Sequence, residues 1–398
     1  MQSATPDDKP SRAKAALLVN MIAPARLPLF SALAKHFDLL LLHGGVEANR
    51  GGWRGVEDNL KGAAVIKAWG WQIPVWRRNG EFQDRRYVHF TPGYLWHLFR
   101  FRPEVVVTNE IGFRTVAALL YGTLMRKPVW VWWGGTVHTE RRTGPARKFV
   151  RAAIARWARH WISYGRTSTE YLQSLGIRRN AIVEIQNSAD ERRFANRVEP
   201  TFRLHPRPVL LCVGSLTARK GAVSLLHAAA AQQREGRSFS LLLVGSGPER
   251  GKLEMLVRDL ALQNVHFQAE CPPEELPGIY RSGDILVFPT LEDVWGMVAN
   301  EAVLSGIPVL CSRYAGCAPE LFPEGSIFDP KDPRDFHDKL GAALAGKLHP
   351  VDPTRLKSTE VVAGALIRAL EGSLRRPLDC RPEGEAARVL KHNAQQAP

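Results

Sequence analysis

The sequence predicts an α/β protein with two doubly wound domains that face each other across a cleft. Three observations lead to this prediction. The chain has 398 residues, more than one ordinary hydrophobic core organises. Short apolar runs alternate with helical stretches in both halves, a pattern typical of parallel sheets covered by helices on both faces. A stretch with little hydrophobic pattern separates the halves and contains Pro200, Pro206 and Pro208.

The first half carries a series of short apolar runs, each followed by a longer stretch with helical spacing. The candidate strands are residues 15–22, 37–42, 103–108, 128–133, 160–164 and 182–185. We expect residues 1–14 to be a disordered N-terminus, residues 15–195 to form the first domain and residues 196–208 to be a linker. The second half repeats the pattern in a domain at 209–374. Its candidate strands are residues 209–213, 240–244, 265–268, 285–288 and 307–311, with a last helix at 360–374.

The two ends of the chain are interpreted separately. Lys9, Arg12 and Lys14 precede the apolar run 15–25 and imitate the start of a secretory signal peptide. Asn20 interrupts that run, and we expect a buried β-strand there instead. The tail at 375–398 has few apolar residues and is expected to be disordered. No apolar run reaches the length of about 18 residues that a membrane-spanning helix needs.

Positive charge and tryptophan are concentrated in the first half. The formal net charge of +15 arises entirely within residues 1–200, which also hold every tryptophan except Trp295. Such a combination suits an anionic membrane surface, and it also suits nucleic acid. The candidate contact segments are residues 94–102 and an amphipathic helix predicted at 145–161. The alternative is that the apolar stripe of this helix faces its own core.

The five cysteines all lie in the second half, at positions 212, 271, 311, 317 and 380. Their number is odd, and no C-x-x-C pair or nearby histidine gives the spacing of a metal site. We therefore expect reduced thiols, no bound metal and a cytoplasmic protein.

The most informative segment is residues 287–321. It places two carboxylates, Asp293 and Glu301, on either side of a Trp-Gly turn, with an apolar strand before the turn and a helix after it. The first N–H groups of a helix have no partner within the helix, so those of Gly296, Met297 and Val298 should form an anion site. A sugar attached to a diphosphate matches this arrangement, because its phosphates suit the N–H groups and its hydroxyls suit the carboxylates.

Two glycine-containing loops follow strands of the second half. Gly214 begins the loop that carries Arg219 and Lys220, and these cations could neutralise a diphosphate leaving group. Gly245 begins a loop that opens a helix, as in a dinucleotide site. Arg250 occupies the position of the third glycine of that motif, so a hydride-transfer enzyme is disfavoured. In the first half, a Gly-rich loop after a strand holds His138, which would lie on the acceptor side of the cleft.

These segments resemble the group 1, family 4 retaining glycosyltransferases of GT-B fold, with two Rossmann-like domains. The resemblance covers most of the chain and is strongest over residues 209–321. The chain departs from the family in having Asp293 where a glutamate is usual, and Ser215 where an arginine is common. Asp293 keeps the spacing to Glu301, but Glu292 could also fill the first position.

The resemblance implies roles for the residues named above. The implied catalytic residues are Asp293, His138, Lys220 and Arg219, and the implied donor-binding residues are Gly214, Gly245, Gly296, Met297, Val298 and Glu301. The implied reaction is the metal-independent, retaining transfer of a hexose from a nucleotide-diphospho-sugar to a lipid-linked or saccharide acceptor, without a cofactor. Cell-surface polysaccharide or glycolipid synthesis, on the inner face of the cell membrane, is the expected context.

Two other classes of function stay open at this point. One is a nucleotide-sugar epimerase or another non-transferase built on the same scaffold, which would alter the donor without an acceptor. The other is a basic nucleic-acid-binding protein with a degenerate sugar site, which the two carboxylates and the loops of the second half disfavour. The base, the sugar, the acceptor, the linkage and the oligomeric state cannot be deduced from the sequence.

Overall fold

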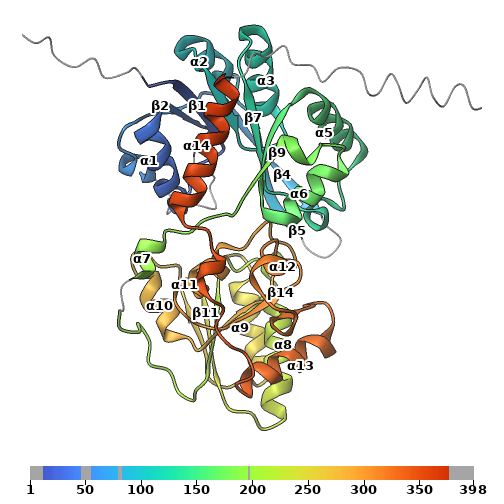
Figure 1. The fold of residues 1–398 in the computed structure, drawn as a ribbon. Coiled ribbons are helices and arrows are strands. Elements are labelled where there is room, and N and C mark those ends of the chain that lie inside the picture. The colour runs from blue at the N-terminus through green and yellow to red at the C-terminus, as the bar shows by residue number, and fades with distance from the viewer. Residues whose placement is uncertain (1–11, 46–54, 79–82, 196–197, 376–398) are drawn as a thin grey trace, which may run out of the picture.

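Two parallel β-sheets, one in each lobe of the molecule, organise the chain (Figure 1). The computed structural model describes residues 12–45, 55–78, 83–195 and 198–375. The first sheet has the order β3-β2-β1-β6-β7-β8-β9 and the second has the order β12-β11-β10-β13-β14-β15. The predicted α/β class with two doubly wound parallel sheets is confirmed. We expected residues 1–14 and 375–398 to be disordered. Most of these residues lie outside the described ranges.

The inner strands of the first sheet are apolar runs that are buried on both faces, whereas the edge strands at 63–67 and 182–185 are partly exposed. The strands of this sheet are β1 (Lys14–Val19), β2 (Asp38–His43), β3 (Ala63–Lys67), β6 (Val105–Thr108), β7 (Val129–Trp133), β8 (His160–Tyr164) and β9 (Ile182–Ile185). Successive side chains of a strand point to opposite faces, so Leu17 joins the cluster that holds α1, whereas Leu18 joins the cluster that holds α2 and α3. The sheet is therefore covered on both sides.

The helices of the first lobe pack on these two faces. They are α1 (Leu27–His36), α2 (Gly93–Phe101), α3 (Phe113–Met125), α4 (Val137–Glu140), α5 (Pro145–Trp157) and α6 (Gly165–Ser174), with short 3-10 turns η1 (Pro24–Arg26), η3 (Val56–Asn59) and η4 (Arg179–Ala181). The short helix α7 (Glu191–Ala195), which follows the last strand, instead contacts helices of the second lobe (Figure 1). Between β3 and α2 the chain forms an antiparallel hairpin of β4 (Trp71–Arg78) and β5 (Gln83–Phe90), which the sequence analysis did not anticipate.

The second lobe has the same layered construction. Its strands are β10 (Val209–Val213), β11 (Ser240–Val244), β12 (Val265–Gln268), β13 (Ile285–Phe288), β14 (Val309–Ser312) and β15 (Ile327–Phe328). Its helices and turns are η5 (Ala218–Lys220), α8 (Ala222–Arg234), α9 (Arg250–Asp259), α10 (Leu276–Ser282), α11 (Met297–Leu304), α12 (Ala318–Leu321), η6 (Glu324–Ser326), α13 (Pro333–Leu344) and η7 (Pro353–Arg355).

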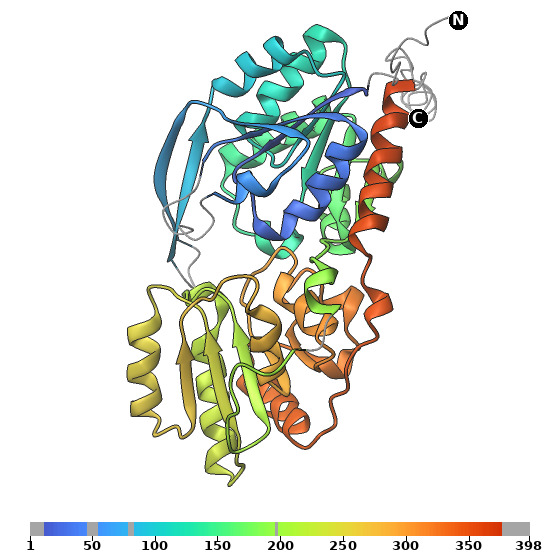
Figure 2. The ribbon, with the colours of Figure 1, turned by 90° about the vertical axis from the view of Figure 1, so that its left-hand side faces the viewer.

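The last helix, α14 (Thr359–Arg375), leaves the second lobe and lies beside α1 of the first lobe (Figure 2). Its apolar face, with Val362, Leu366 and Leu370, is part of the same core as Leu29 and Leu33 of α1. The indole N–H of Trp130 donates to Ser373 Oγ at 3.1 Å. The helix thus ties the two lobes together.

Several predicted element ends need correction, among them the end of the strand predicted at 15–22, which is at Val19. Two further cases show the reason. The helix predicted at 145–161 ends at Trp157, because Trp161 belongs to β8, where it pairs with β7 and is completely buried. The strand predicted at 307–311 begins only at Val309. In both cases the pattern of apolar residues continued past a change of backbone conformation.

Candidate functional site

The carboxyl ends of the two sheets meet at the junction between the lobes. The loops that follow β7 and β8 in the first lobe contact the loops that follow β13 and β14 in the second. Thr167 Oγ1 donates to the carbonyl of Gly316 at 3.0 Å, and the backbone N–H of Arg166 donates to Glu320 Oε1 at 2.5 Å. Ligands of open parallel sheets bind beyond these ends of the strands, so the junction is where a bound substrate is expected.

The turn between β13 and α11 is shaped by one glycine and one tryptophan. Gly296 has a φ of +107°, a conformation that favours glycine, and a Cβ at this position would lie 2.4 Å from Cε1 of Phe288. Trp295 is completely buried, and its indole N–H donates to Asn300 Oδ1 at 2.9 Å. Helix α11 begins at Met297 without a side-chain cap, so its first N–H groups are not used by a capping side chain.

Asp293 and Lys220 form the closest charged pair of the turn. Lys220 Nζ lies 2.6 Å from Asp293 Oδ2, and Asp293 Oδ1 accepts from the N–H of Trp295 at 3.3 Å. Burial alone would raise the pKa of Asp293, but the Lys220 ammonium and the Arg219 guanidinium outweigh it and hold that pKa below its usual value. Asp293 is therefore an ionised acceptor at neutral pH.

Arg219 is held against the same turn through backbone atoms. Its Nη1 donates to the carbonyl of Glu292 at 2.7 Å, and its own carbonyl accepts from the N–H of Leu291 at 2.9 Å. Gly221, which follows η5, permits this approach, since a Cβ there would lie 1.9 Å from the carbonyl oxygen of Pro289. The structure thus brings Asp293 together with Arg219 and Lys220, although it follows these two neighbouring cations by more than seventy positions in sequence.

Gly214 and Gly245 bring the loops after β10 and β11 into backbone contact. A Cβ at Gly245 would lie 2.0 Å from the carbonyl oxygen of Gly214, and the N–H of Gly214 donates to the carbonyl of Val244 at 2.9 Å. No larger residue fits at position 245 without a shift of the backbone. This packing places the two loops side by side at the carboxyl end of the second sheet.

Glu301 lies on α11 and has a partner that the sequence did not reveal. Tyr280 of α10 donates its hydroxyl to Glu301 Oε2 at 2.6 Å. Burial raises the pKa of Glu301 to about 7, although the hydrogen bond from Tyr280 lowers it. Glu301 therefore changes its protonation state close to neutral pH. Only a long-range contact defines the role of Tyr280, so no local motif could have indicated it.

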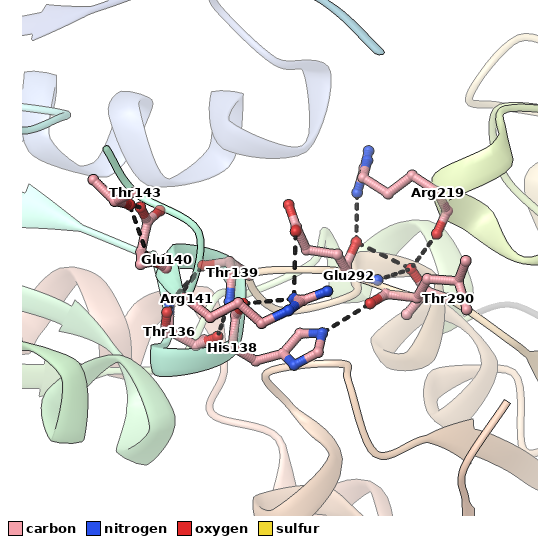
Figure 3. A network of polar contacts seen from close by, with 10 residues as sticks. Thr136, His138, Thr139, Glu140, Arg141, Thr143, Arg219, Thr290 and Glu292 are labelled. Carbon is pink, nitrogen blue, oxygen red and sulfur yellow. Dashed lines mark hydrogen bonds and ion pairs between the residues drawn. The ribbon is translucent and has the colours of Figure 1, made fainter. Parts of the chain in front are cut away.

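His138 lies on α4 and reaches across the junction (Figure 3). Its Nε2 lies 2.9 Å from the carbonyl oxygen of Leu291, and its ring stacks on that of Tyr314 with 4.2 Å between the centroids. Thr136 caps α4 through a reciprocal pair of bonds with Thr139. Burial lowers the pKa of His138, which favours the neutral ring at pH 7. The sequence-predicted His138 thus contacts the segment that leads into Asp293.

Glu292 and Asp293 are neighbours in sequence but have different partners. Asp293 binds Lys220, whereas Glu292 Oε2 lies 3.7 Å from Nη1 of Arg141, a residue of the first lobe (Figure 3). Arg141 in turn donates to the carbonyl of His138 at 2.7 Å. The structure therefore pairs the Asp293 carboxylate with Lys220 of the second lobe, whereas the Glu292 carboxylate lies beside Arg141 of the first lobe. Arg141 belongs to the contact between the lobes and was not expected from the sequence.

Cys212, Cys271, Cys311 and Cys317 are free thiols, and burial raises the pKa of Cys212 to about 12. Cys380 lies outside the described residues. In the described part of the chain, no group of three or more histidine, cysteine or acidic residues could hold a metal ion. Within the same ranges, none of the helices has the length and apolar character required to cross a membrane.

Comparison with known proteins shows which family the second lobe resembles. Residues 197–357 match the family model described as glycosyl transferases group 1. The match lies within the second lobe, which is thus similar to a group 1 glycosyl transferase domain. The matched residues of this domain include Arg219, Lys220, Asp293 and Glu301, so the resemblance inferred from the sequence is confirmed.

Curated relatives of the group 1 domain align over parts of their length. The chain is 34% identical over 139 residues to the D-inositol 3-phosphate glycosyltransferase of Corynebacterium jeikeium (strain K411), covering 32% of this chain and 33% of that protein. It is 23% identical over 314 residues to the sulfoquinovosyl transferase SQD2 of Arabidopsis thaliana, covering 73% of this chain and 58% of that protein. The chain thus spans about one third of the length of the first relative and less than two thirds of the length of the second.

Solved structures agree over the whole chain, including the lobe outside the group 1 domain. Anabaena Alr3699/HepE in complex with UDP and glucose has a TM-score of 0.63 at 16% identity and covers 96% of this chain and 100% of that one. WaaG, a glycosyltransferase involved in lipopolysaccharide biosynthesis, has a TM-score of 0.56 at 16% identity, covering 92% and 96%. At such identities the likeness shows the fold, and the predicted GT-B architecture is confirmed.

Proposed function

We propose that this protein is a retaining, metal-independent hexosyltransferase that uses a nucleotide-diphospho-sugar as its donor. The observation that carries the proposal is the convergence of Lys220, Arg219 and Asp293 beside the uncapped start of α11. Two cations and a helix N-terminus suit a diphosphate, and a carboxylate held ionised beside them suits sugar hydroxyls. The names of the relatives and the UDP in the HepE structure are consistent with such a donor.

The proposed mechanism assigns each group a physical task. The N–H groups of Gly296, Met297 and Val298 hold the diphosphate together with the two cations, while Asp293 accepts hydrogen bonds from hydroxyls of the hexose. The bond between the anomeric carbon and the diphosphate breaks, and its electron pair stays on the phosphate oxygen. The acceptor hydroxyl bonds to the same carbon on the same face and gives its proton to the departing diphosphate.

Glu301 and His138 complete the proposed donor site. Glu301 accepts from ribose hydroxyls of the nucleotide when ionised, and its bond from Tyr280 orients the carboxylate. His138 positions the segment before Asp293 by its contact with the carbonyl of Leu291. Gly214 and Gly245 let the backbone of the second lobe approach the nucleotide closely. The acceptor is proposed to be a lipid-linked or saccharide hydroxyl in glycolipid or surface-polysaccharide synthesis.

Incubation of the protein with UDP-, GDP- and ADP-hexoses tests this proposal. A transferase releases the nucleoside diphosphate, even if only slowly to water when no acceptor is present, and it retains the anomeric configuration. An epimerase would return an altered nucleotide sugar without releasing the diphosphate. If no donor is consumed, and the protein instead binds duplex DNA or RNA with a steep salt dependence, the nucleic-acid alternative gains and the transferase proposal is contradicted.

We further propose that the first lobe docks on an anionic membrane through α3 and α5. Exposed apolar residues line both helices, and Phe149 of α5 is the most exposed of them, at 76%. Exposed cations surround this surface: Arg126, Arg147, Lys148, Arg156 and Arg159. Trp157 of α5 donates its indole N–H to Thr123 of α3 at 3.0 Å, which holds the two helices together. Apolar side chains ringed by cations suit lipid better than nucleic acid.

Vesicle co-sedimentation tests whether this surface binds an anionic membrane. We expect binding to vesicles with anionic phosphatidylglycerol, weak binding to neutral phosphatidylcholine, and a loss of binding in Phe149→Ser. Met255→Ser is the matched control, because Met255 is an exposed apolar residue of α9 in the second lobe. Equal sedimentation with both kinds of vesicle, or binding to duplex nucleic acid instead, would remove the membrane proposal.

A further inference from the structure

Arg26 lies at the carboxyl end of the first sheet with its guanidinium between two aromatic rings. It is the last residue of η1, which follows β1. The guanidinium carbon is 4.8 Å from the ring centroids of both Trp132 and Tyr164. Its Nη2 donates to Tyr164 Oη at 2.5 Å, and Asn109 Nδ2 donates to the same oxygen at 3.3 Å. The aromatic faces fix the plane of the guanidinium.

The charge of Arg26 is not balanced by the protein. The two fully buried arginines of the first lobe, Arg114 and Arg151, are each paired with a carboxylate, that of Glu110 and that of Glu140. Arg26 forms no ion pair with any carboxylate of the described ranges, and its Nη1 is enclosed without a hydrogen-bond partner. Arg26 is half-buried, and an enclosed N–H group without a partner on a cation without an anion is costly; a bound anion would compensate for this cost.

Arg26 and its two partners lie on the first-lobe side of the junction. Asn109 follows β6 and Tyr164 ends β8, so both lie at the carboxyl ends of strands, where ligands of open sheets bind. Gly165, the next residue, touches the second lobe, because a Cβ there would lie 2.8 Å from Cζ3 of Trp295. Arg26 is therefore near the turn that precedes α11 but belongs to the opposite lobe from the donor cations.

We propose that Arg26, with Asn109 and Tyr164, binds an anionic group of the acceptor, so that the acceptor is a phosphate- or carboxylate-bearing saccharide or lipid. The planar fork of an arginine matches the oxygens of either anion, and Nη1 offers a donor that no protein atom uses. This inference rests on the proposed transferase function, since it assigns the first-lobe side of the junction to the acceptor. The donor diphosphate is the other possible source of such an anion, and the experiment separates the two.

Titration calorimetry in the presence of saturating UDP tests the inference. Glucose 6-phosphate, glucuronic acid and glucose serve as probes for a phosphate, a carboxylate and a neutral sugar. We expect at least one anionic sugar to bind about tenfold more tightly than glucose, because a charged partner strengthens a hydrogen bond. This preference should disappear in Arg26→Met and persist in Arg100→Met, since Arg100 is an exposed arginine that lies over Trp96 of α2.

Several results would overturn the inference. Equal binding of all three sugars to the wild type would mean that no acceptor anion is recognised. A loss of UDP affinity in Arg26→Met would assign the cation to the donor diphosphate. A large fall in the melting temperature of ligand-free Arg26→Met would indicate a structural role for Arg26. In that case Arg26→Lys, which keeps the charge but not the planar fork, is the second variant, and an unchanged preference for anionic sugars in it would contradict recognition by the fork. If the wild type binds no nucleotide, the transferase proposal fails. The role of Arg26 is still tested in that case, by comparing the binding of the three sugars without UDP.

Discussion

Arg141 of the first lobe and Glu292 of the second form an ion pair across the junction, with 3.7 Å between Nη1 and Oε2. Glu292 is only 2% exposed, so its charge depends on the partners that surround it. Together with the contact between His138 and Leu291, the pair fixes the segment that leads into Asp293. The segment that leads into Asp293 is thus held by contacts with the first lobe.

Removing the two halves of this pair should have unequal effects. Arg141→Ala removes one cation from beside a buried carboxylate and should destabilise the protein by about 3 kcal/mol, whereas Glu292→Gln removes an anion from beside a partly exposed guanidinium and should cost less. Thermal unfolding measures both. The charge-reversed pair Arg141→Glu with Glu292→Arg should recover part of the lost activity; no recovery relative to the single variants would mean that the pair does not couple the lobes.

Lys220→Ala should lower turnover by about 100-fold, the typical effect of removing one group that stabilises a developing negative charge. The same substitution should raise the pKa of Asp293, whose ionisation Lys220 supports. Steady-state kinetics with the accepted nucleotide sugar measure the first effect. Lys252→Ala serves as the control, since Lys252 lies on α9 and pairs with Glu249. A turnover of Lys220→Ala within about twofold of wild type would exclude this role for Lys220.

Nucleotide affinity should depend on pH through Glu301. Burial raises the pKa of this carboxyl to about 7, so it is protonated below that pH and accepts fewer hydrogen bonds from the ribose. Affinity should therefore rise as pH increases through about 7. Glu301 binds its proton more tightly in the folded than in the unfolded protein. Its contribution to the free energy of unfolding therefore decreases as pH rises from the usual pKa of 4.5 to about 7.

Tyr280→Phe provides an independent test of that pH dependence. The hydrogen bond from Tyr280 lowers the pKa of Glu301, so its removal should shift the midpoint of the binding curve to higher pH. Glu301→Gln should remove the dependence altogether. Isothermal titration at a series of pH values gives both results, and an unchanged midpoint in Tyr280→Phe would show that another group titrates.

Gly296→Ala should destabilise the protein by about 2 kcal/mol or more, because alanine is strained at a φ of +107° and its Cβ would meet the ring of Phe288. Gly372→Ala in α14 is the control. A Cβ at Gly372 meets no atom within 4 Å, and alanine favours a helix, so this variant should be slightly more stable than wild type. Equal melting temperatures for the two variants would contradict the account of the turn.

Much of the fold could be predicted because parallel strands buried on both faces are continuous apolar runs. The strands at 209–213 and 240–244 were predicted with the bounds that the structure shows. The hairpin of β4 and β5 was missed because Pro74 and several charged residues interrupt its pattern. The end of α5 was predicted too late because Trp161 continues the helical spacing, although it packs inside the sheet.

The candidate site was predictable only where its residues form a local motif. Asp293, Glu301 and the start of α11 lie within one short segment, and Lys220 precedes a glycine in a recognisable loop. Arg141, Tyr280 and Arg26 act through contacts with residues far away in the chain, and nothing in their own neighbourhood marks them. Their roles follow from tertiary packing.

Thermal unfolding with UDP, GDP and ADP, each added alone, tests the central claim most directly, with the Glu301→Gln variant alongside. A ligand at about 100 times its dissociation constant stabilises a fold by roughly 2.7 kcal/mol, which is readily measured. We predict stabilisation by one of these nucleotides, and its loss or marked reduction in the variant. If none of them stabilises the wild type, or if the variant responds equally, then the turn between β13 and α11 is not a nucleotide-sugar site.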